Sequence, residues 1–241
     1  MSDAVQADTL SAMPAAVRWI VGILFVLAMP LFLILGNVLD VAGDRQFYAS
    51  EFVKYDIGRV TGLSRDELAT VADAFITYLS VPTARLDVEV TLGGVRRPLF
   101  NEREIAHMED VQKLFGLVRQ TRLAAGAILL ILPLVGLKLG GGAFLPRLGT
   151  LLTIGGIMTV VLLGLAGLAS LVDFTEAFVT FHEMAFSNDL WMLDPRTDYL
   201  IMLFPEGFWL DATLRIAMYS AIEAVILVAV GLGISYFGAR R

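Results

Sequence analysis

The chain has 241 residues, of which 57% are hydrophobic and 17% charged, and its formal net charge is −6. That apolar share is larger than a soluble domain of this length normally carries, so we expect a membrane protein. The acidic balance argues against nucleic acid as a partner. Because the chain contains no cysteine, it can have no disulfide, no thiolate nucleophile and no lipid attached through cysteine.

Four apolar runs are each close to the roughly 20 residues that cross a bilayer. They predict transmembrane helices at about residues 19–38, 123–139, 148–171 and 212–236. The first run is too long, and begins too late, to be a cleaved signal peptide. The fold class we expect is an all-α membrane protein, a four-transmembrane-helix bundle with a small extracytoplasmic α+β cap, forming a single membrane domain over residues 1–241.

The short connections predict the orientation, because they follow the positive-inside bias most reliably. Lys138 at the end of the second run and Arg147 just before the third are basic, no acid lies between them, and the chain ends in two arginines. We therefore expect both the N- and C-termini in the cytoplasm, and residues 39–122 and 172–211 outside. Arg119 and Arg122, at the outer end of the second run, oppose this bias.

The first outer segment contains patterns of regular structure. Ser64 followed by Glu67 is a capping-box pattern, and apolar residues then recur at helical spacing, which predicts a helix over residues 65–79. Apolar residues alternate with acids over residues 86–90 and lead into the two glycines at 93–94, which predicts a strand entering a hairpin turn. The outer segment is thus expected to contain one helix and one hairpin.

One of the two histidines lies in a further helical pattern over residues 101–118, with Asn101 as the expected N-cap. His107 falls beside the apolar face of this helix. Glu104 and Asp110 are its neighbours at a spacing of three, and either could hydrogen-bond the imidazole ring.

The second histidine, His182, lies just beyond the third apolar run, in a helix expected to continue through Phe186. Both imidazoles should therefore be near the outer membrane surface. A zinc-protease motif is incomplete, because His182-Glu183 lacks a second histidine three residues later, although two histidines and a carboxylate could still bind a metal. The aromatic residues of the second outer segment are expected to be an interfacial belt; they are Trp191, Tyr199, Phe208 and Trp209.

Glu223 lies near the middle of the fourth apolar run, where an ionisable side chain suggests a function. The alternative interpretation is a glutamate that is hydrogen-bonded to Asn37 or Ser220.

FNEREIAHMEDVQ and FHEMAFSNDLWMLDPRTDYLIMLFPEGFW resemble the two signature regions of the bacterial lipoprotein intramolecular transacylases, the Lit family. The resemblance extends to the order of spans and outer segments. It implies a multi-pass enzyme of the bacterial cytoplasmic membrane with an outward-facing site. It further implies that the sn-2 acyl chain of an S-diacylglyceryl-cysteine lipoprotein moves to the N-terminal α-amine, giving the lyso-form. The implied partners are the diacylated lipoprotein N-terminus and membrane lipid; no cofactor or metal is implied.

By position, His107 and His182 match the two catalytic histidines of that family. We interpret His107 as the general base, oriented by Glu104 and Asp110, and His182 as the acid or oxyanion donor; the reverse assignment stays open. The expected supporting or substrate-positioning residues, for which helix capping or solvation is the competing explanation, are Asn101, Glu102, Arg103, Asn188 and Asp189. The alternatives are a non-enzymatic membrane receptor or assembly protein, and a metal-dependent membrane hydrolase.

Overall fold

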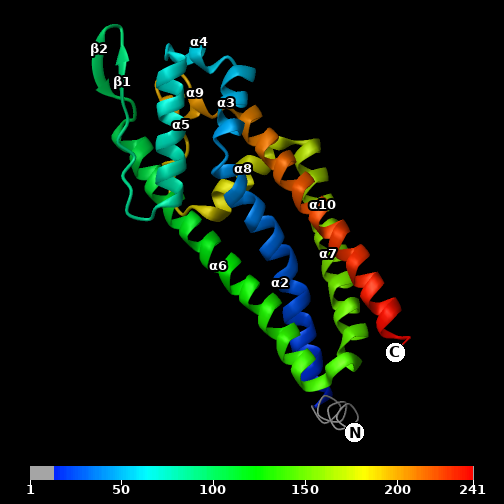
Figure 1. Ribbon diagram of the computed structural model, residues 1–241. Coiled ribbons are helices and arrows are strands. Elements are labelled where there is room, and N and C mark those ends of the chain that lie inside the picture. Colours follow the sequence, from blue (N-terminus) through cyan, green and yellow to red (C-terminus); the bar gives the residue numbers. More distant parts are fainter. Residues whose placement is uncertain (1–13, 241) are drawn as a thin grey trace. The chain divides into compact units, whose positions relative to one another are not determined.

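A computed structural model describes residues 14–240 of the chain (Figure 1). The Cα trace divides into two compact units. We call residues 14–37, Arg119–Gly167 and 216–240 the span unit, and Val38–Val118 with Leu168–Arg215 the cap unit.

The described chain is mostly helical, with one two-stranded antiparallel sheet (Figure 1). The helices are α2 (Ala15–Ala42), α3 (Arg45–Lys54), α4 (Ile57–Thr61), α5 (Arg65–Ser80), α6 (Glu102–Gly140), α7 (Leu145–Val172), α8 (Phe174–Ala185), α9 (Tyr199–Leu203) and α10 (Glu206–Gly238). A short 3₁₀ turn, η1 (Gly141–Phe144), connects α6 to α7. The strands are β1 (Glu89–Leu92) and β2 (Val95–Pro98).

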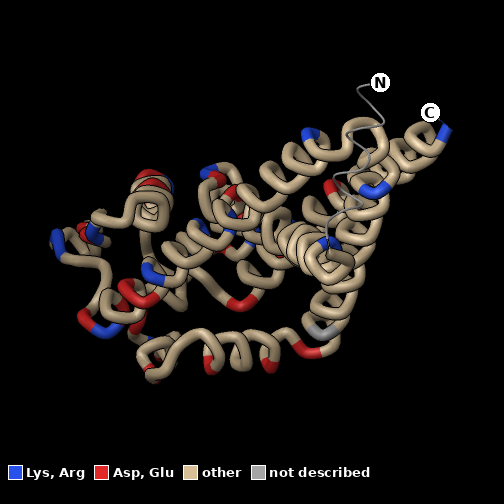
Figure 2. Tube along the Cα trace, turned by 90° about the horizontal axis from the view of Figure 1, so that it is seen from below, with Lys and Arg blue, Asp and Glu red and all other residues tan. Residues whose placement is uncertain are grey.

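Three helical stretches of the described chain are long and apolar enough to cross a membrane: Ala15–Ala42, Glu102–Val172 and Glu206–Gly238. The middle stretch runs through α6, η1 and α7 and contains two of the predicted spans. The count of four crossings therefore stays a prediction. Figure 2 shows the corresponding long helical stretches with few coloured charged residues, as a hydrocarbon environment requires.

Within the span unit, α7 and α10 approach each other at paired glycines. A Cβ atom on Gly149 would lie 2.5 Å from the backbone oxygen of Gly231, and a Cβ on Gly231 would lie 2.6 Å from the backbone oxygen of Gly149. Small residues allow this close backbone approach in membrane helices. Ala224 of α10 also packs in an apolar cluster with residues of α2, namely Phe25, Met29 and Leu33.

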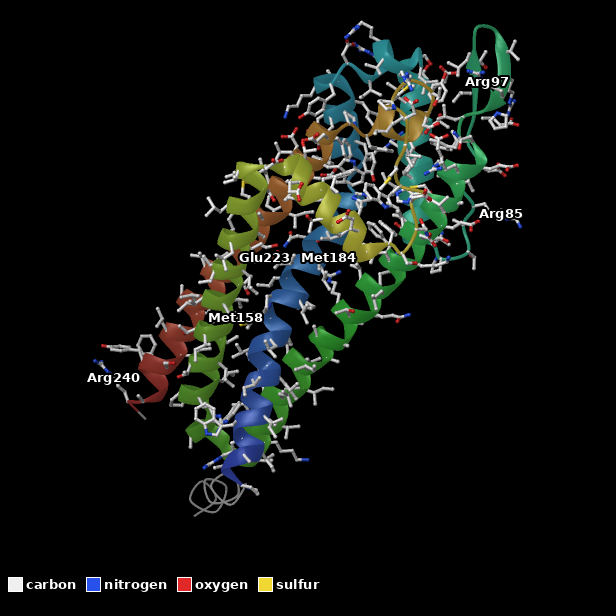
Figure 3. The ribbon with its side chains drawn as sticks, turned by 180° about the vertical axis from the view of Figure 1, so that it is seen from behind. Arg85, Arg97, Met158, Met184, Glu223 and Arg240 are labelled. Carbon is white, nitrogen blue, oxygen red and sulfur yellow. The ribbon has the colours of Figure 1, made fainter. Side chains whose placement is uncertain are left out.

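A polar contact also connects α2 to α10 in the span unit. The side-chain amide of Asn37 donates to Ser220 Oγ at 3.1 Å and to Glu223 Oε2 at 2.9 Å. The structure thus confirms the hydrogen-bonded arrangement suggested for Glu223, which is labelled in Figure 3.

In the cap unit, the predicted capping box is confirmed: Ser64 Oγ accepts from the Glu67 amide, and the Glu67 carboxylate accepts from the Ser64 amide. Glu67 also accepts from the amide of Thr91 at 2.8 Å, which connects the start of α5 to the hairpin. The predicted hairpin turn is confirmed as well, with Leu92 paired to Val95 across it. The strand that enters it begins at Glu89 and not at residue 86.

The observed helices differ from the predicted segments in two places. The pattern over residues 101–118 and the second apolar run form one continuous helix, α6, because no glycine or proline interrupts the chain between them. Helix α8 ends at Ala185, with Phe186 as its C-cap instead of its last helical residue. These boundaries place each histidine on a helix that continues past it by at least three residues.

An aromatic cluster forms much of the cap core. Its rings approach at centroid distances from 4.7 to 6.4 Å in several pairs. They belong to Phe47, Tyr48, Phe52, Phe75, Phe100, Phe204 and Phe208. Helices α9 and α10 place Phe204 and Phe208 in this cluster, on either side of Pro205.

Candidate active site

The structure places the two histidines side by side within the cap unit. His107, on α6, and His182, on α8, have ring centroids 6.1 Å apart with an interplanar angle of 36°. Their exposed fractions are only 7% and 8%. Two segments distant in sequence therefore bring both imidazoles into one buried position.

The backbone of α8 fixes the hydrogen bonding of one ring. His182 Nδ1 lies 2.8 Å from the carbonyl oxygen of Phe178, one helical turn earlier. Because a carbonyl can only accept, Nδ1 carries the proton, and in the neutral ring Nε2 keeps its lone pair. Burial lowers the pKa of His182 below its ordinary value of 6.5, and the bond to Phe178 offsets part of this effect. The neutral imidazole is thus favoured.

Aromatic side chains surround His182. The ring centroids of Phe178, Trp191, Phe181 and Phe186 lie 4.1, 5.0, 5.3 and 5.6 Å from that of His182. The sequence predicted Trp191 in an interfacial belt and did not indicate the phenylalanines as site residues. For Phe178 and Phe186 the spacing was an available signal, because residues four before and four after a helical residue share its face.

His107 lies beside the same aromatic group, with its ring centroid 5.1 Å from that of Phe186. Its Nδ1 is buried and has no hydrogen-bond partner among the described residues. That atom is therefore positioned to bond a group supplied by a ligand or by water, because a buried polar atom normally has a partner.

The expected hydrogen bond from Glu104 to the His107 ring is wrong. One oxygen of Glu104 accepts from the amide of Asn101 at 2.7 Å, and the other accepts from the amide of Leu200 at 2.6 Å. Asn101 Oδ1 in turn accepts from the Glu104 amide at 3.0 Å, which confirms Asn101 as the N-cap. Glu104 points toward the helix start and α9 because both carboxylate oxygens satisfy backbone donors there.

Asp110 likewise bonds groups other than the ring. Its carboxylate accepts from Asn188 Nδ2 at 2.9 Å and from Lys113 Nζ at 2.9 Å. On the preceding turns, Arg103 donates to the backbone oxygen of Asp189.

A further bond connects the start of α6 to the residues before α9: Asn101 Nδ2 donates to Asp198 Oδ1 at 3.0 Å. Together with the bonds of Arg103, Glu104 and Asp110, it attaches the segment 187–200 to the first two turns and a half of α6. The predicted supporting residues of the two motifs thus pair with one another. Glu102 is exposed.

Several apolar side chains of α8 and of the loop after it are exposed. Phe181 and Met184 of α8 are 52% and 83% exposed, and Met192 of the following loop is 56% exposed. Figure 3 labels Met184 on α8. Among residues 14–240, no three or more His, Cys, Asp and Glu side chains are grouped as metal ligands would be.

Long apolar helices and a buried pair of imidazoles define a helical membrane protein with a candidate proton-transfer site. The family model described as lipoprotein intramolecular transacylase Lit matches residues 23–209. The chain therefore belongs to the Lit family, and the resemblance suggested by its two motifs is confirmed.

Solved structures agree on the fold. The membrane integral lipoprotein intramolecular transacylase Lit from Bacillus cereus is 19% identical, with a TM-score of 0.80 over 95% of this chain and 100% of that chain. A histidine-to-alanine variant of the same protein gives a TM-score of 0.75 at 19% identity, covering 94% and 97% of the two chains. A protein from Aquifex aeolicus (strain VF5) is 28% identical over 133 residues, which are 55% of this chain and 56% of that relative.

Proposed function

We propose that this protein is a lipoprotein intramolecular transacylase. Its substrate would be a lipoprotein whose N-terminal cysteine bears a diacylglyceryl thioether, and its product would be the lyso-form with the acyl chain on the α-amine. The observation that carries the proposal is the pair of buried imidazoles, 6.1 Å apart, in a member of the Lit family.

The reaction requires two proton transfers and no enzyme nucleophile. The substrate amine forms a bond to the acyl carbon, the bond from that carbon to the sn-2 oxygen breaks, and one proton moves from nitrogen to the glyceryl oxygen. All atoms are conserved, so the product has the mass of the substrate. An imidazole suits both transfers because its ordinary pKa, about 6.5, lets it accept and donate a proton near neutral pH.

The hydrogen bonding favours His182 as the general base. Its Nδ1 is occupied by the Phe178 carbonyl, so Nε2 is the atom with a lone pair for the amine proton. The reason for choosing His107 as the base was orientation by Glu104, and that carboxylate bonds two backbone amides instead. We therefore assign His107 to the ester side, where a ring N–H would bond the developing oxyanion or the departing oxygen.

Positioning would supply much of the remaining acceleration. Holding the amine and ester of one molecule in attack geometry contributes roughly 7 to 11 kcal/mol in favourable intramolecular cases. Phe181, whose ring centroid lies 5.3 Å from that of His182, and the exposed Met184 and Met192 fit acyl chains and surrounding lipid as partners. We further propose that the site faces outward from the bacterial cytoplasmic membrane, with both termini in the cytoplasm.

The test is an assay of the purified full chain on a synthetic diacylglyceryl-cysteinyl peptide. Fragmentation mass spectrometry should show the acyl group moved from glycerol to nitrogen without a change in total mass. His107→Ala and His182→Ala should each lower the rate by about 10²- to 10⁴-fold, the usual contribution of general acid–base catalysis. Arg85→Gln, on an exposed loop, is the matched control and should retain full activity (Figure 3).

No transfer by the native protein, or full activity in both histidine variants, would refute the proposal. A non-enzymatic membrane receptor would give the first outcome.

A further inference from the structure

The two arginines that oppose the positive-inside bias lie on α6 at the start of its apolar run. Arg122 immediately precedes Leu123, the first residue of the predicted span, and Arg119 lies one turn earlier. Gly36 of α2 lies two residues before the end of the first predicted span, so it belongs to the same level of the bilayer as Arg122. That level is the region of the lipid headgroups.

Arg122 packs against α2 within the span unit. Its guanidinium carbon lies 5.4 Å from the centroid of the Phe32 ring, in cation–π geometry. A Cβ atom on Gly36 would lie 3.2 Å from Arg122 Nε and 3.4 Å from Nη2. The absence of a side chain at Gly36 therefore leaves room for the guanidinium against the backbone of α2.

The same packing repeats one turn along both helices. A Cβ on Gly126 would lie 2.9 Å from the Phe32 ring, so the glycine of α6 accommodates a side chain of α2. The glycine of α2 accommodates a side chain of α6 in return. This reciprocal fit holds the Arg122 guanidinium at a defined position. An arginine that only extended its charge into water would not require such packing.

Within residues 14–240, no acidic side chain neutralises the charge of Arg122. Among the described residues, no carboxylate lies within ion-pair distance of Arg122, and its buried Nε has no hydrogen-bond partner. A guanidinium keeps its charge in proteins, and a charge at a bilayer boundary is costly without a counter-ion. A partner anion would supply the missing acceptor.

We propose that Arg122, held between Phe32 and Gly36, binds the phosphate of an anionic membrane phospholipid. A guanidinium presents two parallel N–H groups that match phosphate oxygens. Arg119 adds a second positive charge on the same helix, which strengthens attraction to an anionic headgroup. The diacylglyceryl-cysteine substrate proposed above carries no phosphate and has a cationic amine, so this site would bind structural or regulatory lipid.

The experiment is native mass spectrometry of the detergent-solubilised full chain with phosphatidylglycerol or phosphatidylcholine of matched acyl chains. The wild type should retain phosphatidylglycerol in preference to phosphatidylcholine. Arg122→Gln should weaken phosphatidylglycerol binding about tenfold, as expected for loss of a charge-assisted hydrogen bond. Arg122→Lys should be intermediate, because it keeps the charge and loses the paired donors. Lys138→Gln, which removes one charge near the other end of α6, is the matched control and should bind like wild type.

Equal binding of the two lipids by the wild type, or unchanged phosphatidylglycerol binding in Arg122→Gln, would overturn the proposal. A further measurement adds millimolar inorganic phosphate to the protein with bound phosphatidylglycerol. If the phosphate displaces the lipid completely, the site binds free phosphate and the lipid assignment fails. If Arg122→Gln does not fold, Gly36→Val replaces it, because the added side chain would displace the guanidinium while its charge remains. Retention of phosphatidylglycerol by Gly36→Val at the wild-type level would then count against the site.

Discussion

Asn188 donates a side-chain hydrogen bond of 2.9 Å to Asp110, and this bond joins the two segments that carry the histidines. Asp110 lies three residues after His107 on α6, and Asn188 lies six residues after His182. Among the described residues, no hydrogen bond joins Asp110 or Asn188 to an imidazole, so their bond acts on the site by positioning the two segments. Burial lowers the pKa of His107, and the charge of Asp110 offsets part of this effect.

Removing the Asp110–Asn188 bond should impair turnover by displacing the loop. Asn188→Ala and Asp110→Ala should each lower kcat severalfold and lower the free energy of unfolding by about 1 kcal/mol, the typical net contribution of such a bond. The double variant should lose less than the sum of the two single losses, because both remove the same interaction. Assays of the four proteins in parallel check this; strictly additive losses would contradict it.

The pH dependence should follow His182. Burial lowers its pKa below 6.5, so the neutral base persists at neutral pH and the rate should fall only as the pH drops below 6.5. The folded state binds this proton less readily than the unfolded state, so folding stability should also fall as the pH drops through the same range. His182→Gln should not lose stability in this way. Rate profiles and thermal unfolding between about pH 5 and 8, the range in which histidine titrates, test both effects.

Glu51 should give the opposite pH dependence of stability. It is 8% exposed, and burial together with the nearby Asp211 raises its pKa to about 7 from 4.5. A raised pKa means that the folded state holds the proton more tightly, so this contribution is fully present below pH 4.5 and is lost as the pH rises through about 7. Relative to Glu51→Gln, the wild type should therefore lose about 1–2 kcal/mol across that range.

Thermal unfolding of wild type and Glu51→Gln at about pH 5 and pH 8, on either side of the shifted pKa of Glu51, measures this change in stability. A constant difference between wild type and Glu51→Gln at the two pH values would contradict the prediction. The neighbouring Lys54 and Arg215 lower the pKa of Glu51, which limits the expected size of the effect.

Local patterns predicted the regular elements of the cap because their causes are local. The capping box at Ser64 and the turn at residues 93–94 depend on residues within a few positions of one another, and both are confirmed. The apolar runs likewise predicted membrane helices from composition alone. Helix ends were less predictable: nothing in the sequence breaks α6 before its apolar run, and Phe186 lies just past the end of α8.

The candidate site was predictable in its residues and not in its contacts. His107 and His182 come from motif resemblance, and their proximity is a tertiary fact that no spacing along the chain implies. Glu104 illustrates the limit, since helical spacing allowed a bond to His107 but the amide of Leu200 is the partner. Trp191 is a second example: its ring contact with His182 is a tertiary fact that the sequence did not predict, and its place in an interfacial belt stays a prediction.

The glycines of α10 provide a matched pair for testing the α7–α10 contact. A Cβ atom on Gly231 would lie 2.6 Å from both the Gly149 backbone oxygen and Thr153 Oγ1, whereas a Cβ on Gly233 would meet nothing within 4 Å. Gly231→Ala must therefore separate the helices, and it should lower the free energy of unfolding by about 1–3 kcal/mol, as overpacking does. Gly233→Ala, two residues away on the same helix, should be neutral or stabilise by about 0.4–1 kcal/mol, because alanine restricts the unfolded chain. Thermal unfolding in one detergent compares the two variants directly, and an equal melting temperature for both would show that α7 and α10 do not pack through these glycines.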